Sequence, residues 1–191
     1  MLALAFYRRG ITVEETDAAP FRSALAHAIR THADGPRVLI HRDYFAGNLL
    51  LLPERQGVAR VGVIDFQLGQ MGQPVYDLVS LLQDARRDVS RSVEAAMIAR
   101  FAEARGLGDI GAAYAVWGVQ RSLRILGIFA RLCLVEGKSG YLTHLPRVMR
   151  DLRRNLTHPV LVEVKRFCDG LLPDPTPENI AKLEAQCGSF R

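Results

Sequence analysis

The sequence predicts an α+β fold that is mostly helical and carries a small β insertion near its N-terminus. Two observations support this prediction. From Pro74 onward, apolar residues recur at helical spacing almost without interruption, whereas residues 37–64 contain three short apolar runs separated by turn residues. The length of 191 residues, with 49% hydrophobic residues, indicates one domain over 1–191 with a sizeable core.

The first elements follow from local spacing. Apolar residues at 21, 25 and 29 recur every four positions, which predicts an amphipathic helix over 18–33 with Asp17 as its cap. Asp34-Gly35-Pro36 ends that helix. Three strands and a Gly/Gln-rich loop are then expected, at 37–40, 49–52, 60–64 and, for the loop, 67–73.

The remaining chain is predicted to form six helices, at 75–86, 90–105, 109–136, 141–156, 159–170 and 177–186. The third is rich in Ile, Leu, Ala and Phe and is expected at the centre of the core. Thr176-Pro177 marks a helix start, with a hydroxyl cap and a proline in the first turn. Cys133, Cys168 and Trp117 lie in apolar helical contexts and are expected to be buried.

Composition excludes several functions. No apolar run is long enough to cross a bilayer. The net charge of +5 comes mainly from arginines that are dispersed among acidic residues, so we do not expect nucleic-acid binding. This positive charge is compatible with an anionic phosphate substrate. An odd number of widely spaced cysteines, Cys133, Cys168 and Cys187, argues against a disulfide framework or a zinc site and suits a reducing cytoplasm.

The polar residues of the β insertion suggest chemistry. Asp43 and Asn48 lie on a loop between two predicted strands, and the third strand ends at Asp65. If the strands pair, Asn48 and Asp65 converge. Their carboxylate and amide oxygens would suit Mg²⁺ bridging phosphate oxygens. Asp43, free of the metal, could accept a hydroxyl proton during phosphoryl transfer, a reaction that mostly needs positioning and charge neutralisation.

The same spacing matches a known template. Residues 41–48 read H-R-D-x-x-x-x-N, and Asp65-Phe66 matches two of the three positions of the downstream Asp-Phe-Gly, with Gln67 in place of glycine. The sequence thus resembles the kinase-like superfamily. No Ala-Pro-Glu segment or activation loop follows. The order HRDY, DFQ, G-x-P and YDL-SLL-D over 41–84 is instead similar to the aminoglycoside phosphotransferase family, above all to a bacterial subgroup containing N-acetylmuramate/N-acetylglucosamine kinases.

The resemblance implies a role for each matching residue. Asp43 would be the catalytic base, Asn48 and Asp65 would bind Mg²⁺, and His41 and Asp77 would support the loop. The acceptor would be a small hydroxyl-bearing molecule, a sugar or amino sugar, with Arg121 and Arg124 as candidates for its pocket. Taken singly, His41 reads as a core histidine, Asp77 as a helix cap and the two arginines as solvated residues.

Kinase-like enzymes also need a nucleotide lobe with a lysine and a glycine-containing hairpin. The 40 residues before His41 contain no lysine and read as helix, loop, helix. The resemblance therefore implies the C-terminal lobe of a protein-kinase-like fold alone. We expect little or no ATP binding or kinase activity from this chain by itself, and self-association through the face that the missing lobe would cover.

Two explanations of the missing lobe stay open: a start at an internal methionine, or a natural short homologue that has lost ATP binding. In the first, the chain is part of an ATP- and Mg²⁺-dependent small-molecule kinase in the cytoplasm. In the second, it is a non-catalytic module for binding or scaffolding. The three intact site residues favour the enzyme, and the missing lobe favours the module. The sequence does not name the phosphate acceptor.

Overall fold

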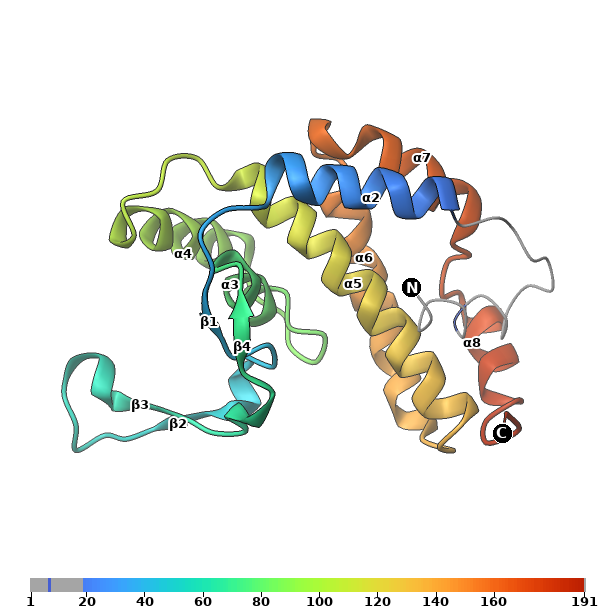
Figure 1. Ribbon diagram of the computed structural model, residues 1–191. Coiled ribbons are helices and arrows are strands. Elements are labelled where there is room, and N and C mark those ends of the chain that lie inside the picture. Colours follow the sequence, from blue (N-terminus) through green and yellow to red (C-terminus); the bar gives the residue numbers. More distant parts are fainter. Residues whose placement is uncertain (1–6, 8–18, 191) are drawn as a thin grey trace.

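The computed structural model describes Tyr7 and residues 19–190, and it is mostly helical (Figure 1). Its α-helices are α2 (Ala19–His32), α3 (Val75–Leu82), α4 (Arg91–Ala104), α5 (Gly111–Leu134), α6 (Leu145–Asn155), α7 (Val162–Leu171) and α8 (Pro177–Glu184). The strands are β1 (Val38–Ile40), β2 (Leu49–Leu51), β3 (Val61–Val63) and β4 (Gln70–Gly72). Among the described residues, no helix has the length and apolar character needed to cross a membrane. The predicted α+β class with few strands is confirmed.

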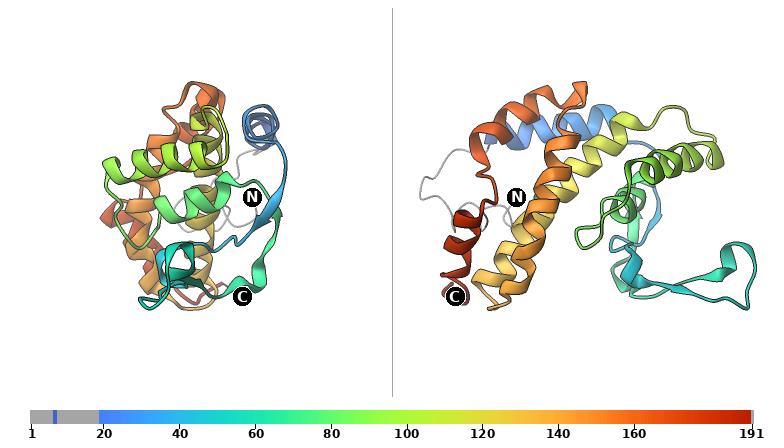
Figure 2. Two further views of the ribbon diagram at one scale, coloured as in Figure 1. Left: turned by 90° about the vertical axis from the view of Figure 1, so that its left-hand side faces the viewer. Right: turned by 180° about the vertical axis from the view of Figure 1, so that it is seen from behind.

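Helices α2 to α8 are here called the helical body, and helix α5 lies at its centre. It runs beside α6 along its length and also contacts α2, α3 and α8, while α2 and α7 lie together across one end (Figures 1 and 2). Leu126 and Ala130 of α5 and Leu145 and Leu152 of α6 have no exposed surface. The central place predicted for this helix is confirmed. Cys133 and Cys168 are buried as predicted, and Trp117 is half-buried against the core.

One glycine sets how closely α5 and α6 approach. A Cβ atom on Gly118 would lie 2.3 Å from Nδ2 of Asn155 on α6, closer than real side chains come. Asn155 exchanges two hydrogen bonds with the amide of Gln83, of 2.8 and 3.1 Å, and both side chains are buried. Since each buried amide satisfies the other, this pair fixes α6 against the end of α3 without an unpaired polar group.

The strands form two separate antiparallel pairs. β1 pairs with β4, and β2 pairs with β3 in the register Leu49↔Val63. The predicted strands at 37–40, 49–52 and 60–64 are confirmed, each shorter by one or two residues. The expectation that 67–73 is a loop was wrong for Gln70–Gly72. These residues have no alternating apolar pattern and become a strand because β1 offers them a ladder partner.

Several helix ends also differ from the prediction. Helix α3 stops at Leu82 and not at residue 86, because Oδ1 of Asp84 accepts a hydrogen bond from the backbone N–H of Arg86, at 2.9 Å, and forms a turn. Residues 139–144 and 159–161 are 3₁₀ turns that precede α6 and α7. Thr176 caps α8 as predicted, accepting from the backbone N–H of Asn179 at 3.2 Å. The predicted cap Asp17 lies outside the described residues.

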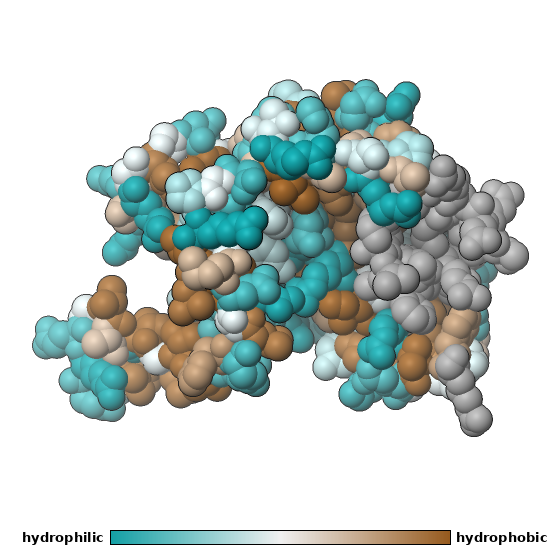
Figure 3. All heavy atoms as spheres, viewed as in Figure 1, coloured by the Kyte–Doolittle hydropathy of each residue, from teal (hydrophilic) through white to brown (hydrophobic). Residues whose placement is uncertain are grey.

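The segment from β1 to β4, residues 38–72, is here called the β segment. Its β2–β3 hairpin projects away from the helical body, and apolar side chains cover much of it (Figures 1 and 3). Val58 is 94% exposed, Leu39 76% and Phe66 71%. Further exposed apolar residues of the segment are Leu50, Leu51, Val61, Val63, Ile64, Leu68 and Met71.

Candidate active site

The loop between β1 and β2 is held by the first turn of α3. The carboxylate of Asp77 accepts two hydrogen bonds from backbone N–H groups, at 2.6 Å from His41 and at 2.9 Å from Arg42. A carboxylate that accepts from two successive backbone groups fixes the path of the chain at that point. These bonds are what a bracing role of Asp77 requires, and the role itself stays a prediction.

His41 ties the same loop to the end of β3. Its Nε2 donates to the carbonyl oxygen of Ile64 at 2.9 Å, because a carbonyl can only accept. Its ring packs edge-on against Tyr44, with ring centroids 5.9 Å apart. Ile64 immediately precedes Asp65, so this hydrogen bond joins the loop to the residue before Asp65. It is a contact of the kind that a structural role of His41 requires, and the role itself stays a prediction.

The hairpin register brings Asn48 and Asp65 together. Asn48 precedes β2 and Asp65 follows β3, so pairing of these strands places both residues at the same end of the hairpin. Nδ2 of Asn48 donates to the carbonyl oxygen of Asp43 at 2.9 Å and lies 3.4 Å from Oδ2 of Asp65. One amide group thus links all three residues that the sequence singled out for catalysis and metal binding.

The backbone is strained at two points of the site. Arg42 has φ of 72° and Asp65 has φ of 62°, and these are the non-glycine residues with positive φ in the described part of the chain. Such conformations cost roughly 1–3 kcal/mol each and persist where surrounding contacts impose them. For Arg42 the contact is the hydrogen bond to Asp77. Residues in such conformations cluster at active sites and ligand-binding sites.

Gln67, which replaces the glycine of the kinase motif, contacts Asp65 directly. Its Nε2 donates to Oδ1 of Asp65 at 2.5 Å. Glycine at this position of the kinase motif could not make this contact. The amide of Gln67 thus orients the exposed carboxylate of Asp65.

The two arginines proposed from the sequence have different environments. Arg121 is only 7% exposed, and its Nη1 donates to the carbonyl oxygen of Gln83 at 3.1 Å. Burial lowers the pKa of Arg121, and the nearby carboxylates of Asp84 and Asp43 oppose this. Arg124 is half-buried and donates to the hydroxyl of Tyr76 at 3.1 Å. The interpretation of Arg121 as a solvated surface residue is therefore wrong.

The sequence reasoning missed the role of the turn after α3. Asp84 is 2% exposed, and its Oδ2 has no hydrogen-bond partner among the described residues. The turn that it forms places the guanidinium of Arg86 over the ring of Phe45, 4.7 Å from its centroid. Asp84 ends the YDL-SLL-D pattern, which was the available signal. The turn therefore links α3 to the candidate catalytic loop.

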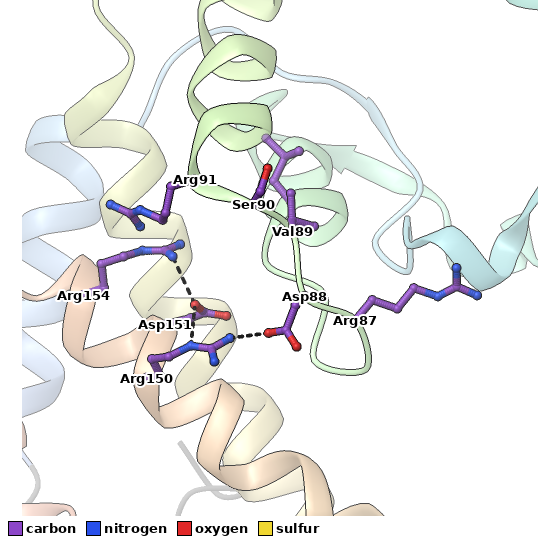
Figure 4. Close-up of a pocket in the computed structure, with 9 residues that line it drawn as sticks. Arg87, Asp88, Val89, Ser90, Arg91, Arg150, Asp151 and Arg154 are labelled. Atoms are coloured by element: carbon purple, nitrogen blue, oxygen red, sulfur yellow. Dashed lines mark hydrogen bonds and ion pairs between the residues drawn. The ribbon is translucent and has the colours of Figure 1, made fainter.

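A pocket of about 360 Å³ lies beside this turn, and none of the predicted site residues lines it. Its lining is Leu82, Arg87, Asp88, Val89, Ser90, Arg91, Arg150, Asp151 and Arg154 (Figure 4). Four of the charged groups that line it form ion pairs, Arg150 with Asp88 at 2.7 Å and Arg154 with Asp151 at 3.3 Å. Hydrogen bonds from Arg147 and Arg150 hold the pKa of Asp88 well below its usual range, whereas burial raises that of Asp151.

The candidate metal site has few protein ligands. The described residues contain no group of three or more His, Cys, Asp or Glu side chains able to hold a metal ion. Asn48 and Asp65 offer one amide oxygen and one carboxylate. That is a fitting set for Mg²⁺, which is usually bound by one or two carboxylates while substrate phosphates and water complete its shell.

Comparison with known proteins identifies the class. A mostly helical fold in which an H-R-D-x-x-x-x-N loop precedes a strand and Asp-Phe is the arrangement of kinase-like phosphotransferases. Residues 2–117 match the sequence model of the Phosphotransferase enzyme family, APH. Because this match covers more than half of the 191 residues, the chain belongs to that family.

Its relatives include three bacterial proteins named N-acetylmuramate/N-acetylglucosamine kinase. The protein of Caulobacter vibrioides is 44% identical over 142 residues, covering 73% of this chain and 39% of the relative. That of Neisseria meningitidis is 39% identical, covering 62% and 37%, and that of Pseudomonas aeruginosa 33%, covering 81% and 47%. The family and subgroup inferred from the sequence are confirmed. The chain spans less than half the length of these curated relatives.

Proposed function

We propose that this chain is the catalytic-loop part of an ATP-dependent phosphotransferase that acts on a hydroxyl group of an amino sugar. The observation that carries the proposal is the convergence of Asp43, Asn48 and Asp65 through the single amide of Asn48, at 2.9 and 3.4 Å. The names of its relatives support the substrate class, since all three act on N-acetylated amino sugars by name.

In the proposed mechanism, each residue acts through a short-range contact. The carboxylate of Asp43 accepts the proton of the acceptor hydroxyl while the oxygen of that hydroxyl attacks the terminal phosphorus of ATP. Asn48 and Asp65 would hold Mg²⁺, which would neutralise charge on the phosphates when bound. His41 and Asp77 fix the loop, so that the geometry is set before substrate arrives and little reorganisation is needed during transfer.

We propose that Arg121 and Arg124 bind the phosphate acceptor. Arg124 lies beside Tyr76. Arg121 is buried, and the charge of the Asp43 carboxylate is among those that oppose the lowering of its pKa, which supports a place for Arg121 on the side of the candidate catalytic loop. A buried guanidinium is a strong donor to sugar hydroxyl and carbonyl oxygens. The turn at Asp84 would have a positioning role, through the contact of Arg86 with Phe45.

ATP binding is proposed for the full-length form of the protein. The apolar surface of the β segment is of the kind that a second lobe covers, and no lysine occurs before His41. We therefore expect these 191 residues alone to turn over little ATP. The exposed apolar surface also favours a second candidate, a non-catalytic module whose exposed β segment binds a partner or a second copy of the chain. We place the proposed kinase in the cytoplasm, where ATP is available.

The test compares the full-length protein containing these residues with its Asp43→Asn variant, assayed by phosphorylation of N-acetylmuramate and N-acetylglucosamine. Loss of a positioned general base lowers turnover by about 10²–10⁴-fold. Asp109→Asn is the matched control, because Asp109 is exposed and its side chain accepts one hydrogen bond, from the backbone N–H of Gly111, which the side-chain oxygen of asparagine can also accept. Melting temperatures of all three proteins should agree.

Turnover unaffected by Asp43→Asn would contradict the assigned base. Absence of any turnover in the full-length wild type would favour the module. Robust Mg²⁺-dependent ATP turnover by the 191-residue chain, abolished by Asp43→Asn, would contradict the expected inactivity of the chain alone.

A further inference from the structure

Two of the three cysteines lie in contact, although 54 positions separate them in the sequence. Sγ of Cys133, in the last turn of α5, is 2.7 Å from Sγ of Cys187, which follows α8. A disulfide bond has an S–S distance of about 2.05 Å, so the sulfurs need to approach by only about 0.7 Å more to form one. Both thiols are free in this structure.

Backbone hydrogen bonds fix this contact. The backbone N–H of Gly188 donates to the carbonyl oxygen of Cys133 at 2.9 Å, and that of Phe190 donates to Leu134 at 3.0 Å. Gly188 has φ of 75°, a conformation that glycine adopts without strain, and this lets the chain turn onto the end of α5. The two backbone hydrogen bonds that directly follow Cys187 therefore hold this residue against the end of α5.

The two sulfurs differ in access. Cys133 has no exposed surface, whereas Cys187 is partly exposed. Burial, aided by the hydrogen bond to Cys187, raises the pKa of the Cys133 thiol to about 12, so this group stays protonated at neutral pH. An oxidant from solution therefore meets Cys187 first, and Cys133 is placed to react second. Cys168 is also fully buried, and no sulfur contact of its own is found among the described residues.

We propose that Cys133 and Cys187 are a redox modification site, where a peroxide converts the two thiols into a reversible intramolecular disulfide. The peroxide O–O bond breaks as Cys187 sulfur takes one oxygen, giving a sulfenic acid and releasing an alcohol, or water from hydrogen peroxide. The Cys133 sulfur then attacks the Cys187 sulfur. The S–S bond forms, the S–O bond breaks, and hydroxide leaves with the Cys133 proton as water. The two thiols are oxidised by two electrons and the peroxide is reduced.

The bond would fasten the C-terminal segment to α5, the helix that also carries Arg121 and Arg124. It closes a long loop, which restricts the unfolded chain more than the folded one. The oxidised protein should therefore melt on the order of 10 °C higher than the reduced protein. A small dithiol reverses the bond by thiol–disulfide exchange, provided that Cys187 stays accessible.

The test treats the dilute, folded 191-residue chain with hydrogen peroxide, blocks remaining thiols with N-ethylmaleimide after unfolding, and maps the peptides by mass spectrometry. We expect one blocked cysteine, Cys168, a linked pair of peptides containing Cys133 and Cys187, and loss of two hydrogens from the intact monomer. Dithiothreitol should restore three blockable thiols.

Two serine variants complete the test. Cys168→Ser is the matched control and should keep the linkage. Cys187→Ser should abolish it, and because Cys187 is partly exposed this variant is expected to fold, whereas Cys133→Ser introduces a hydroxyl into the core. Three free thiols after peroxide treatment, linkage only between two chains, or a bond that includes Cys168 would each overturn the proposal.

Discussion

The helical body and the β segment contain similar apolar residues but bury them to different extents. Leucine and valine are common in both. In the helical body Leu126, Leu145 and Leu152 have no exposed surface, whereas in the β segment Val58 is 94% and Leu51 69% exposed. The candidate catalytic loop lies where these regions join, tied to α3 by Asp77. Hydrophobic composition alone therefore does not make a core. Apolar side chains are buried only where a second layer covers them, and among the described residues the helical body has such a layer whereas the β2–β3 hairpin does not.

The largest expected effect comes from breaking the helical body. Leu126→Ala removes a fully buried side chain at the centre of α5 and should lower the free energy of unfolding by about 2–5 kcal/mol, through lost burial and the cavity left behind. Urea denaturation followed by circular dichroism measures it. A loss below about 1 kcal/mol would contradict the view that α5 organises the core.

A smaller loss is expected where α5 meets α6. Gly118→Ala forces a methyl group against Asn155 and disturbs its amide pair with Gln83, for an expected loss of about 1–3 kcal/mol. Gly170→Ala is the matched control, because a Cβ there meets nothing within 4 Å and lies in helix α7. It should be neutral or stabilise by about 0.5–1 kcal/mol. Equal effects of the two substitutions would refute the close-packing argument.

Acid should weaken the helical body through Asp88. Hydrogen bonds from Arg147 and Arg150 lower its pKa in the folded protein below the ordinary value of 3.8. The contribution of Asp88 to stability is therefore fully present above about pH 4 and is lost as pH falls further. The effect is small because the side chain is exposed. Denaturation midpoints at pH 7 and pH 3 should differ less in Asp88→Asn than in the wild type, and an equal difference would contradict this.

The smallest effect is expected in the β segment. Leu51→Ala repeats the chemical change of Leu126→Ala on a side chain that is 69% exposed, so the free energy of unfolding should change by no more than about 0.5 kcal/mol. The comparison of the two leucines, measured in the same denaturant, sharpens the contrast between the regions. A loss at Leu51 close to that at Leu126 would mean that the hairpin is covered in solution, as self-association would do.

The sequence predicted what local spacing encodes. Helical periodicity located α5, and the motif 41–48 with Asp65 identified three residues that the fold does bring together. It did not predict strand β4, which has no pattern of its own and exists through its pairing with β1. Nor did it predict the burial of Arg121 and Asp84 or the contact of Cys133 with Cys187, because these depend on how distant elements pack.

The two ends of the β2–β3 hairpin have different surroundings. Its ladder keeps Asn48 beside Asp65 at one end, while the turn near residues 53–60 lies at the other, away from the helical body (Figure 1). A reporter peptide grafted into that turn would leave the ladder intact, and lengthening a loop adds little entropic cost. One residue inserted within β2 would instead slip the register, displacing Asn48 by about 3.3 Å and reversing the faces of the strand. The turn is thus a natural attachment point for engineering this protein, and the strands are not.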